Sequence, residues 1–174
     1  MADRKLLNSE LHRISVQEYK TRPKSGLVLV LDNVRSAYNV GSAFRTSDSF
    51  GVDKVWLCGI CAVPPSVEIH KTALGAEDSV EWEHADDTLA LVERLKDDGY
   101  TVVSVEQTEH SVCLSEFRRE EGRKYALVFG NEVDGVQQEV VDASEFALEI
   151  PQSGTKHSLN VSVSVGVVLW HMVA

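Results

Sequence analysis

The feature that most limits the fold is a series of short, continuous apolar runs separated by segments with helical signals. The runs lie at residues 27–31, 54–58, 101–105, 125–129 and, more weakly, 146–150. Runs of this length without polar alternation are typical of strands covered on both faces of a parallel sheet. Between them, helices are expected over residues 38–50, ended by Gly51, and after a capping residue within 86–88. Strands that alternate with helices predict an α/β fold, a mostly parallel sheet flanked by helices.

The N-terminal segment has a different character. Ser15 and Glu18 have the spacing of a capping box, which predicts one or two short helices within residues 8–20. A proline and a glycine then interrupt the chain. We therefore expect an N-terminal helical extension over residues 1–26 and one further domain over residues 27–174.

The C-terminal segment fits two structures. Residues 158–165 alternate polar and apolar side chains, as a half-buried strand does. Val163, Val167 and Trp170 nevertheless share one helical face, and the last residues favour a helix. These patterns leave strand and helix open.

Composition narrows the class of protein. The 174 residues are 43% hydrophobic, which is enough to bury one core. No run approaches the about 20 apolar residues that span a bilayer. The N-terminus also lacks the apolar stretch of a signal peptide, so we expect a cytoplasmic protein without membrane contact. The histidines show no metal-ligand spacing, and no metal site is expected.

Cys58 and Cys61 form the only closely spaced cysteine pair. Such a pair could be a redox motif or half of a zinc site. However, a second ligand pair is missing from the sequence, and this pair follows a strand instead of opening a helix. Buried thiols at the end of a strand are the favoured interpretation.

The formal net charge of −10 disfavours broad binding to nucleic acid, which depends on lysine and arginine to neutralise phosphates. The charge is uneven, because the first 25 residues carry six basic and three acidic side chains. If the chain binds RNA, this segment is the candidate basic surface. An ordinary solvated helix face is the alternative.

Three polar segments follow predicted strands: DNVRSAYNVGSAFRT, FGNEVDGV and IPQSGTKHSLNVS. Because ligands bind at the carboxyl ends of strands in α/β sheets, these segments form the candidate site. None contains the Gly-Lys-Ser/Thr of a phosphate loop or the GxGxxG dinucleotide fingerprint. A Rossmann-type dehydrogenase or methyltransferase is therefore disfavoured.

Taken in this order and with this spacing, the three segments closely resemble the three motifs of the SpoU (TrmH-type) branch of the SPOUT RNA methyltransferases. The matching positions are Asn39, Gly41 and Arg45; residues 128–132 with Gly135; and Ile150, Pro151, Ser158, Leu159, Asn160 and Ser162. The resemblance extends from about residue 27 to the C-terminus and so covers nearly the whole chain.

The resemblance implies the SPOUT fold, in which the C-terminal part threads through a loop and forms a deep trefoil knot. Knots are almost absent from other proteins, so no pattern of residues predicts one. In that family the segment corresponding to residue 158 onward is a helix. The resemblance also implies a homodimer, whose interface Val163, Val167 and Trp170 would suit; packing within one subunit is the alternative.

The resemblance further implies S-adenosyl-L-methionine as the cofactor, held mainly by main-chain groups of three loops. The corresponding residues are Glu106, Gln107 and Thr108; Val128, Gly130, Asn131 and Gly135; and Ile150, Ser158 and Leu159. Glycine suits such a pocket because it permits close approach and unusual dihedral angles. Val128, Ile150 and Leu159 would give the adenine an apolar slot, although core packing also explains the first two.

The reaction implied is methyl transfer to a ribose 2′-hydroxyl, which needs a group that takes the proton or stabilises the oxyanion. The family's central residue corresponds to Arg45. Because a guanidinium is not deprotonated in proteins, we expect Arg45 to hold a substrate phosphate and polarise the hydroxyl, while the phosphate or solvent accepts the proton. Asn39, Glu132, Ser158 and Asn160 are expected to complete the site; singly, Asn39 and Ser158 could be helix N-caps, Glu132 a solvated loop charge and Asn160 a backbone anchor.

The RNA-binding candidates are Arg45, Lys71, Lys156 and Arg13. Lys71 is expected in the loop after the second strand, which in the similar enzymes lies beside the substrate entrance, and it would contact phosphate there; an ordinary surface charge is the alternative. We expect tRNA as the substrate because many ribosomal RNA members carry a separate N-terminal RNA-binding domain, which this chain is too short to include. Ribosomal RNA is the alternative. A catalytically idle RNA-binding module is a further alternative, but its signature, loss of Arg45 or of the NEVDG loop, is not seen.

Overall fold

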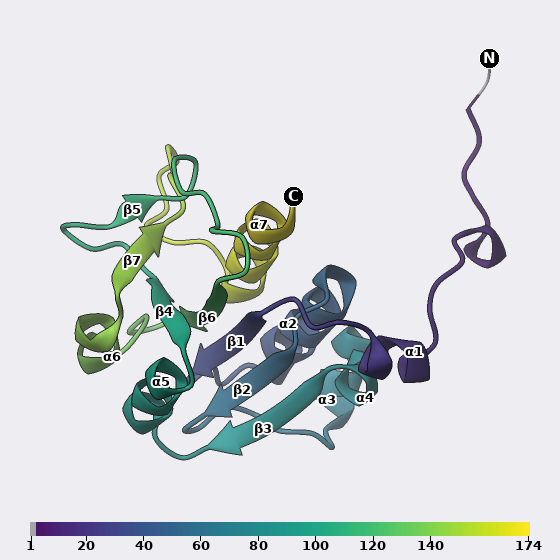
Figure 1. The fold of residues 1–174 in the computed structure, drawn as a ribbon, viewed down its shortest axis with the longest axis horizontal. Helices are drawn as coiled ribbons and strands as arrows, with labels where there is room; N and C mark the ends of the chain where they lie inside the picture. The colour runs from purple at the N-terminus through teal and green to yellow at the C-terminus, as the bar shows by residue number, and fades with distance from the viewer. Residues whose placement is uncertain (1–2) are drawn as a thin grey trace.

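The apolar runs form the centre of a seven-stranded sheet in the computed structural model, which describes residues 3–174 (Figure 1). Its order is β3-β2-β1-β6-β4-β7-β5, and all pairings are parallel. The strands are β1 (Leu27–Asp32), β2 (Lys54–Cys58), β3 (Glu81–Ala85), β4 (Tyr100–Val105), β5 (Val112–Cys113), β6 (Lys124–Phe129) and β7 (Phe146–Glu149). The predicted α/β class is confirmed.

Helices cover both faces of this sheet (Figure 1). They are α1 (Val16–Thr21), α2 (Ala37–Phe50), α3 (Val67–Ala73), α4 (Ala76–Ser79), α5 (Thr88–Asp97), α6 (Gln138–Ala143) and α7 (Val161–Val173), with a 3-10 turn at Asn8–Glu10. One apolar core lies between the sheet and α2, α3 and α7. A second core lies under α5 and α6. Side chains of β1 alternate between the two cores, which explains why its sequence is apolar throughout.

Local signals set the ends of several helices. The capping box predicted at Ser15 is present, since its hydroxyl accepts a hydrogen bond from the backbone N–H of Glu18. Asp87 caps α5 in the same way, as predicted within 86–88. Gly51 ends α2 with a φ of 68°, a backbone conformation that glycine adopts without strain.

The C-terminal segment is a helix, which resolves the ambiguity of its pattern. Asn160 caps α7, and its side chain accepts hydrogen bonds from Ser162. Val165, Val168 and Leu169 are buried on the side of α7 that faces the core, at helical spacing. The trefoil knot does not follow from the strand order alone and stays a prediction.

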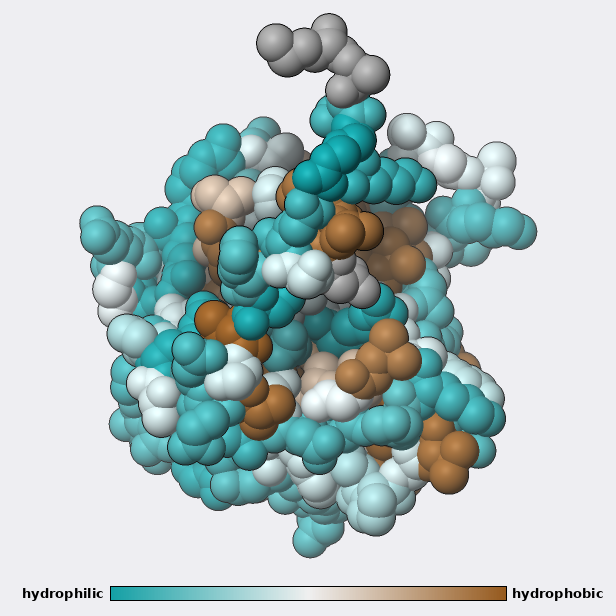
Figure 2. Space-filling view, turned by 90° about the vertical axis from the view of Figure 1, so that its right-hand side faces the viewer, coloured by the Kyte–Doolittle hydropathy of each residue, from teal (hydrophilic) through white to brown (hydrophobic). Residues whose placement is uncertain are grey.

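The chain before α1 extends away from the sheet and its helices (Figures 1 and 2). Tyr19 anchors α1, because its buried hydroxyl donates to the carbonyl oxygens of Ser47 and Val52 at 3.3 and 3.1 Å. Figure 2 shows apolar side chains gathered where this segment meets the body. The proposed boundary at residue 26 stays a prediction, and residues 1–2 lie outside the described chain.

Every helix within residues 3–174 is too short or too polar to cross a bilayer.

Candidate functional site

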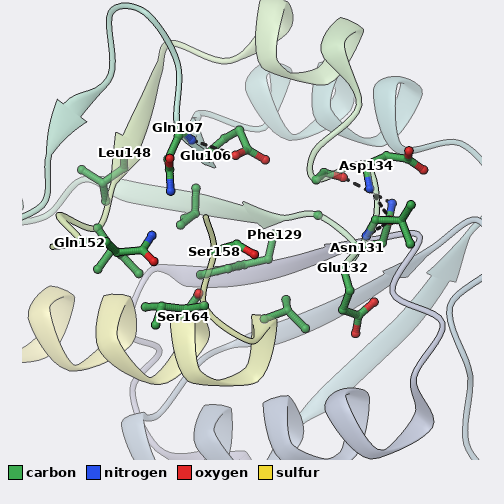
Figure 3. Close-up of a pocket in the computed structure, with 17 residues that line it drawn as sticks. Glu106, Gln107, Phe129, Asn131, Glu132, Asp134, Leu148, Gln152, Ser158 and Ser164 are labelled. Carbon is green, nitrogen blue, oxygen red and sulfur yellow. Dashed lines mark hydrogen bonds between the residues drawn. The ribbon is translucent and has the colours of Figure 1, made fainter. Parts of the chain in front are cut away.

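A cavity of about 310 Å³ lies at the carboxyl ends of β6, β4 and β7, which are neighbours in the sheet (Figure 3). This is the edge at which α/β sheets bind ligands. Figure 3 shows Gln107 and Ser164 on opposite sides of it, with Phe129 and Ser158 between them. The lining residues are Val105, Glu106, Gln107, Phe129, Gly130, Asn131, Glu132, Val133, Asp134, Gly135, Leu148, Ile150, Gln152, Ser158, Leu159, Val161 and Ser164. We call it the glycine-loop cavity.

The glycine loop, residues 130–137, forms one wall and is folded tightly on itself. Asn131 and Gly135 exchange backbone hydrogen bonds of 3.2 and 3.1 Å. A Cβ atom on Gly130 would lie 1.9 Å from the carbonyl carbon of Gly135, so no other residue fits at position 130 without moving the loop. Gly135 has a φ of 70°, which favours glycine. Both glycines are therefore needed for the loop to take this shape.

Two loops are joined around this cavity by side-chain hydrogen bonds. The carboxyl group of Glu106 accepts from the backbone N–H groups of Val136 and Gln107 at 3.1 and 2.8 Å. The side-chain amide of Gln107 donates to the carbonyl oxygen of His157 at 3.0 Å. Glu106 thus braces the glycine loop, and Gln107 holds the exposed segment 151–160.

Most of the predicted cofactor residues line this cavity: Glu106, Gln107, Gly130, Asn131, Gly135, Ile150, Ser158 and Leu159. Val128 does not, because its side chain points into the core beneath α5 and α6, whereas the next residue, Phe129, faces the cavity. Thr108 also lies outside the lining, in a turn where its carbonyl oxygen accepts from Ser111. Phe129 and Leu148 also line the cavity and were not predicted to do so; Phe129 is the last residue of the apolar run 125–129, and Leu148 lies in the middle of the weaker run 146–150.

Residues of all three motifs meet beside the cavity. The amide nitrogen of Asn39 donates a short hydrogen bond to Glu132, and the amide nitrogen of Asn160 donates to the side-chain oxygen of Asn39 at 3.2 Å. Ser158 lines the cavity itself. Asn39 is not the cap of α2, since Ser36 has that role. This arrangement joins segments that lie more than 90 residues apart in the sequence.

Arg45 lies elsewhere within the same chain. It follows Asn39 by six residues on α2, or about 9 Å along the helix axis. Its exposed side chain lines a separate cavity of about 600 Å³ beneath the N-terminal segment, together with Arg13 and Arg22. Among residues 3–174, no hydrogen bond or ion pair holds its guanidinium. We call this the arginine cavity.

The other two RNA-binding candidates are exposed lysines. Lys156 lies in the segment 151–160, which is exposed throughout. Lys71 was expected in a loop, and this expectation is wrong, because it lies on α3. Ser66 caps that helix and accepts from the backbone N–H of Ile69, a signal that the sequence interpretation overlooked.

The cysteine pair is buried at the end of β2, as expected. Burial raises the pKa of Cys58 to about 12 and that of Cys61 to about 11, so both thiols stay neutral at physiological pH. The sulfur of Cys61 also accepts the backbone N–H of Val34 at 3.1 Å. Within the described residues, no cluster of three or more histidine, cysteine or acidic side chains is placed to hold a metal ion.

Comparisons with known proteins point to one family. The model of the SpoU rRNA Methylase family matches residues 26–170. The 23S rRNA (guanosine-2'-O-)-methyltransferase RlmB of Nitrosomonas europaea is 35% identical over 148 residues, which are 83% of this chain and 54% of that protein. The chain thus spans about half the length of this relative.

Solved structures support the same fold. One, described as giving structural insights into the 2-OH methylation of C/U34 on tRNA, is 28% identical and has a TM-score of 0.72. The match covers 83% of this chain and 91% of the chain in that structure. A structure of an AdoMet-bound rRNA methyltransferase from Sinorhizobium meliloti is 24% identical in sequence and has a TM-score of 0.79. The match covers 88% of this chain and 58% of that chain, and it shows that the two proteins share a fold.

Proposed function

The chain belongs to the SpoU rRNA methylase family, and we propose that it transfers the methyl group of S-adenosyl-L-methionine to a ribose 2′-hydroxyl of RNA. The observation that carries this proposal is the hydrogen-bonded group of Asn39, Glu132 and Asn160, which unites the three motifs beside a main-chain cavity. The Nitrosomonas relative is named for this reaction on ribosomal RNA. The chain keeps every residue that the reaction is expected to need, which favours an enzyme over an idle binding module.

The glycine-loop cavity fits the cofactor. Its glycine-loop wall has the closely packed backbone that a main-chain cradle needs, because a Cβ on Gly130 would collide with the backbone of Gly135 and Val136. Ile150 and Leu159 keep accessible surface at the cavity wall and offer an apolar contact for the adenine, while Gln107 and Ser158 offer hydrogen-bonding groups. The Sinorhizobium structure of the same fold is described as AdoMet-bound. When bound, this cofactor supplies a sulfonium methyl group.

The chain's own residues then position the acceptor. Glu132 and Asn160 occupy both ends of the Asn39 side-chain amide, so this amide is fixed before RNA arrives. The Arg45 guanidinium binds the phosphate next to the target ribose and polarises the hydroxyl. The phosphate or solvent takes the proton. Ser158, which lines the cavity, would contact the reacting groups from its wall.

We propose a homodimer that completes this site, since Arg45 does not line the glycine-loop cavity of its own chain. The outer face of α7 suits an interface, because Val163, Val167 and Trp170 are 50%, 37% and 62% exposed. Replacing Val163 with glutamate should convert the dimer to a monomer in analytical ultracentrifugation. A Val163→Glu protein that still sediments as a dimer would exclude this face.

For the substrate we propose tRNA, with ribosomal RNA as the second candidate. We also propose that the protein acts in the cytoplasm. The tRNA proposal is supported by the tRNA-related structure, because this chain covers 91% of it. Arg13, which lines the arginine cavity with Arg45, would bind phosphate there, and the exposed Lys71 and Lys156 would add further contacts. Ribosomal RNA is favoured by the name of the Nitrosomonas relative.

The test is methyl transfer from radiolabelled S-adenosyl-L-methionine to unmodified tRNA and, separately, to ribosomal RNA. Nuclease mapping then locates any 2′-O-methylated nucleotide. Label in one pool supports the reaction and selects the substrate. If neither pool is labelled although calorimetry detects cofactor binding, the idle binding module is favoured. If the cofactor does not bind, the proposed function fails.

A further inference from the structure

Asp32, the last residue of β1, is a fully buried acid at the same edge of the sheet as the proposed cofactor site. Its oxygen Oδ1 accepts hydrogen bonds from the side chains of Thr88, Asn33 and Gln137 at 2.7, 2.9 and 2.7 Å. Its oxygen Oδ2 accepts the backbone N–H of Gln137 at 2.9 Å. Among residues 3–174, no salt bridge joins Asp32 to a cation.

A buried carboxylate without a cation is costly, and its hydrogen bonds offset this cost only while all donors stay in place. The other residues of β1 are all apolar, so Asp32 is the one polar side chain of this strand. The donors of Gln137 come from a segment 105 residues away in the sequence. The carboxyl group therefore fixes the place of a distant segment, which an apolar side chain could not do.

The segment that Asp32 fixes is the end of the glycine loop. Gln137 is its last residue, and both its backbone N–H and its side-chain amide are held. The preceding residue, Val136, is held from the opposite side by Glu106. Closely spaced hydrogen bonds thus orient the wall that carries Gly130 and Gly135.

We propose that Asp32, acting through Gln137, is a positioning residue that sets the glycine loop in the conformation that binds the cofactor. This inference rests on the proposed function, because it assumes that the loop binds S-adenosyl-L-methionine. Asp32 itself touches neither cofactor nor RNA. Replacing Asp32 should therefore weaken cofactor binding by more than the accompanying loss of protein stability explains.

The test compares cofactor affinity with thermal stability. In Asp32→Asn the amide has one acceptor oxygen for four donors, so the loop loses its anchor. The dissociation constant for S-adenosyl-L-methionine, measured by calorimetry well below the melting temperature, should rise about tenfold or more, as expected for the loss of one or two hydrogen bonds. Gln137→Pro tests the same link if Asp32→Asn does not fold. It removes both Gln137 donors, and the φ of −54° at this position suits proline.

Thr88→Val is the matched control, because it removes another hydrogen bond to Asp32 but leaves both Gln137 bonds intact. It should lower the melting temperature and change the cofactor dissociation constant by less than about twofold. Equal weakening of cofactor binding in Thr88→Val and in the loop variants would overturn the proposal, as would unchanged binding in Gln137→Pro. Failure of the wild-type protein to bind the cofactor would instead refute the proposed function.

Discussion

The glycine-loop cavity and the arginine cavity are built in opposite ways. The first is bordered by the tightly folded glycine loop, and internal hydrogen bonds hold its loops before any ligand arrives. The second is bordered by exposed arginine side chains, of which Arg13 and Arg45 make no ion pair within residues 3–174. A preformed pocket suits a small cofactor of fixed shape, whereas exposed cations suit a phosphate backbone that arrives with its own geometry. The two steps of the proposed reaction, holding the methyl donor and holding the RNA, are thus assigned to different kinds of surface.

The largest expected effect separates catalysis from cofactor binding. Arg45→Ala should lower kcat by about a thousandfold, since it removes the group that polarises the hydroxyl. The dissociation constant for the cofactor should stay within about twofold of the wild type, because Arg45 lies outside the glycine-loop cavity. Single-turnover kinetics and calorimetry measure the two quantities. Loss of cofactor affinity would mean that the two cavities are not distinct.

The next effect tests the preformed wall. Gly130→Ala should weaken cofactor binding by about tenfold to a hundredfold and lower the melting temperature, because its Cβ would clash with the backbone of Gly135. Gly154→Ala is the control, since a Cβ there meets nothing within 4 Å. If both variants bind the cofactor equally well in calorimetry, the close approach at Gly130 is irrelevant to binding.

A smaller effect concerns the polar group that connects the motifs. Asn39→Ala should lower kcat about tenfold with little change in cofactor affinity. Asn160→Asp keeps an oxygen to cap α7 but loses the donor to Asn39, so it should lower kcat without lowering the melting temperature. The effects of the two changes on kcat should not add in the double variant. Full additivity would mean that Asn39 and Asn160 act independently.

The smallest effect concerns the N-terminal segment. Arg13→Ala should weaken RNA binding several-fold. It should also reduce the slope of the logarithm of affinity against the logarithm of salt concentration by about one, the amount expected for one lost phosphate contact. Filter binding at several salt concentrations measures both, and cofactor affinity should not change. Lys20→Ala removes an exposed cation of α1 that does not line the arginine cavity and serves as the control. Equal losses in both variants would indicate diffuse electrostatics instead of a defined site.

The sequence predicted the central strands of the sheet better than its edge strands. The central strands have apolar runs because both faces are covered. The edge strand β3, with the sequence EWEHA, is largely exposed and charged, so no apolar run indicated it. At the other edge, β5 has two residues, too few for any pattern. The helix α7 was ambiguous because its valines suit a strand equally well, and only its packing on the core decides.

The candidate site was predictable where spacing within a motif reflects local structure, and not where tertiary contacts decide. The glycine loop and Ile150 line the cavity as expected. The pairing of Asn39 with Glu132 and Asn160 could not be derived from spacing, because it depends on how the strands are ordered. The burial of Asp32 was also not anticipated, since an acid that ends an apolar run reads as a solvated loop residue.

The position of β6 in the sheet has a consequence for biosynthesis. This strand pairs with both β1 and β4, although most of the sheet precedes it in the sequence. While the chain emerges from the ribosome, β1 therefore keeps an unpaired edge until residue 129 is available. Exposed apolar strand edges promote association between nascent chains. The addition of β6 closes this edge, because the strand pairs with β1 on one side and with β4 on the other.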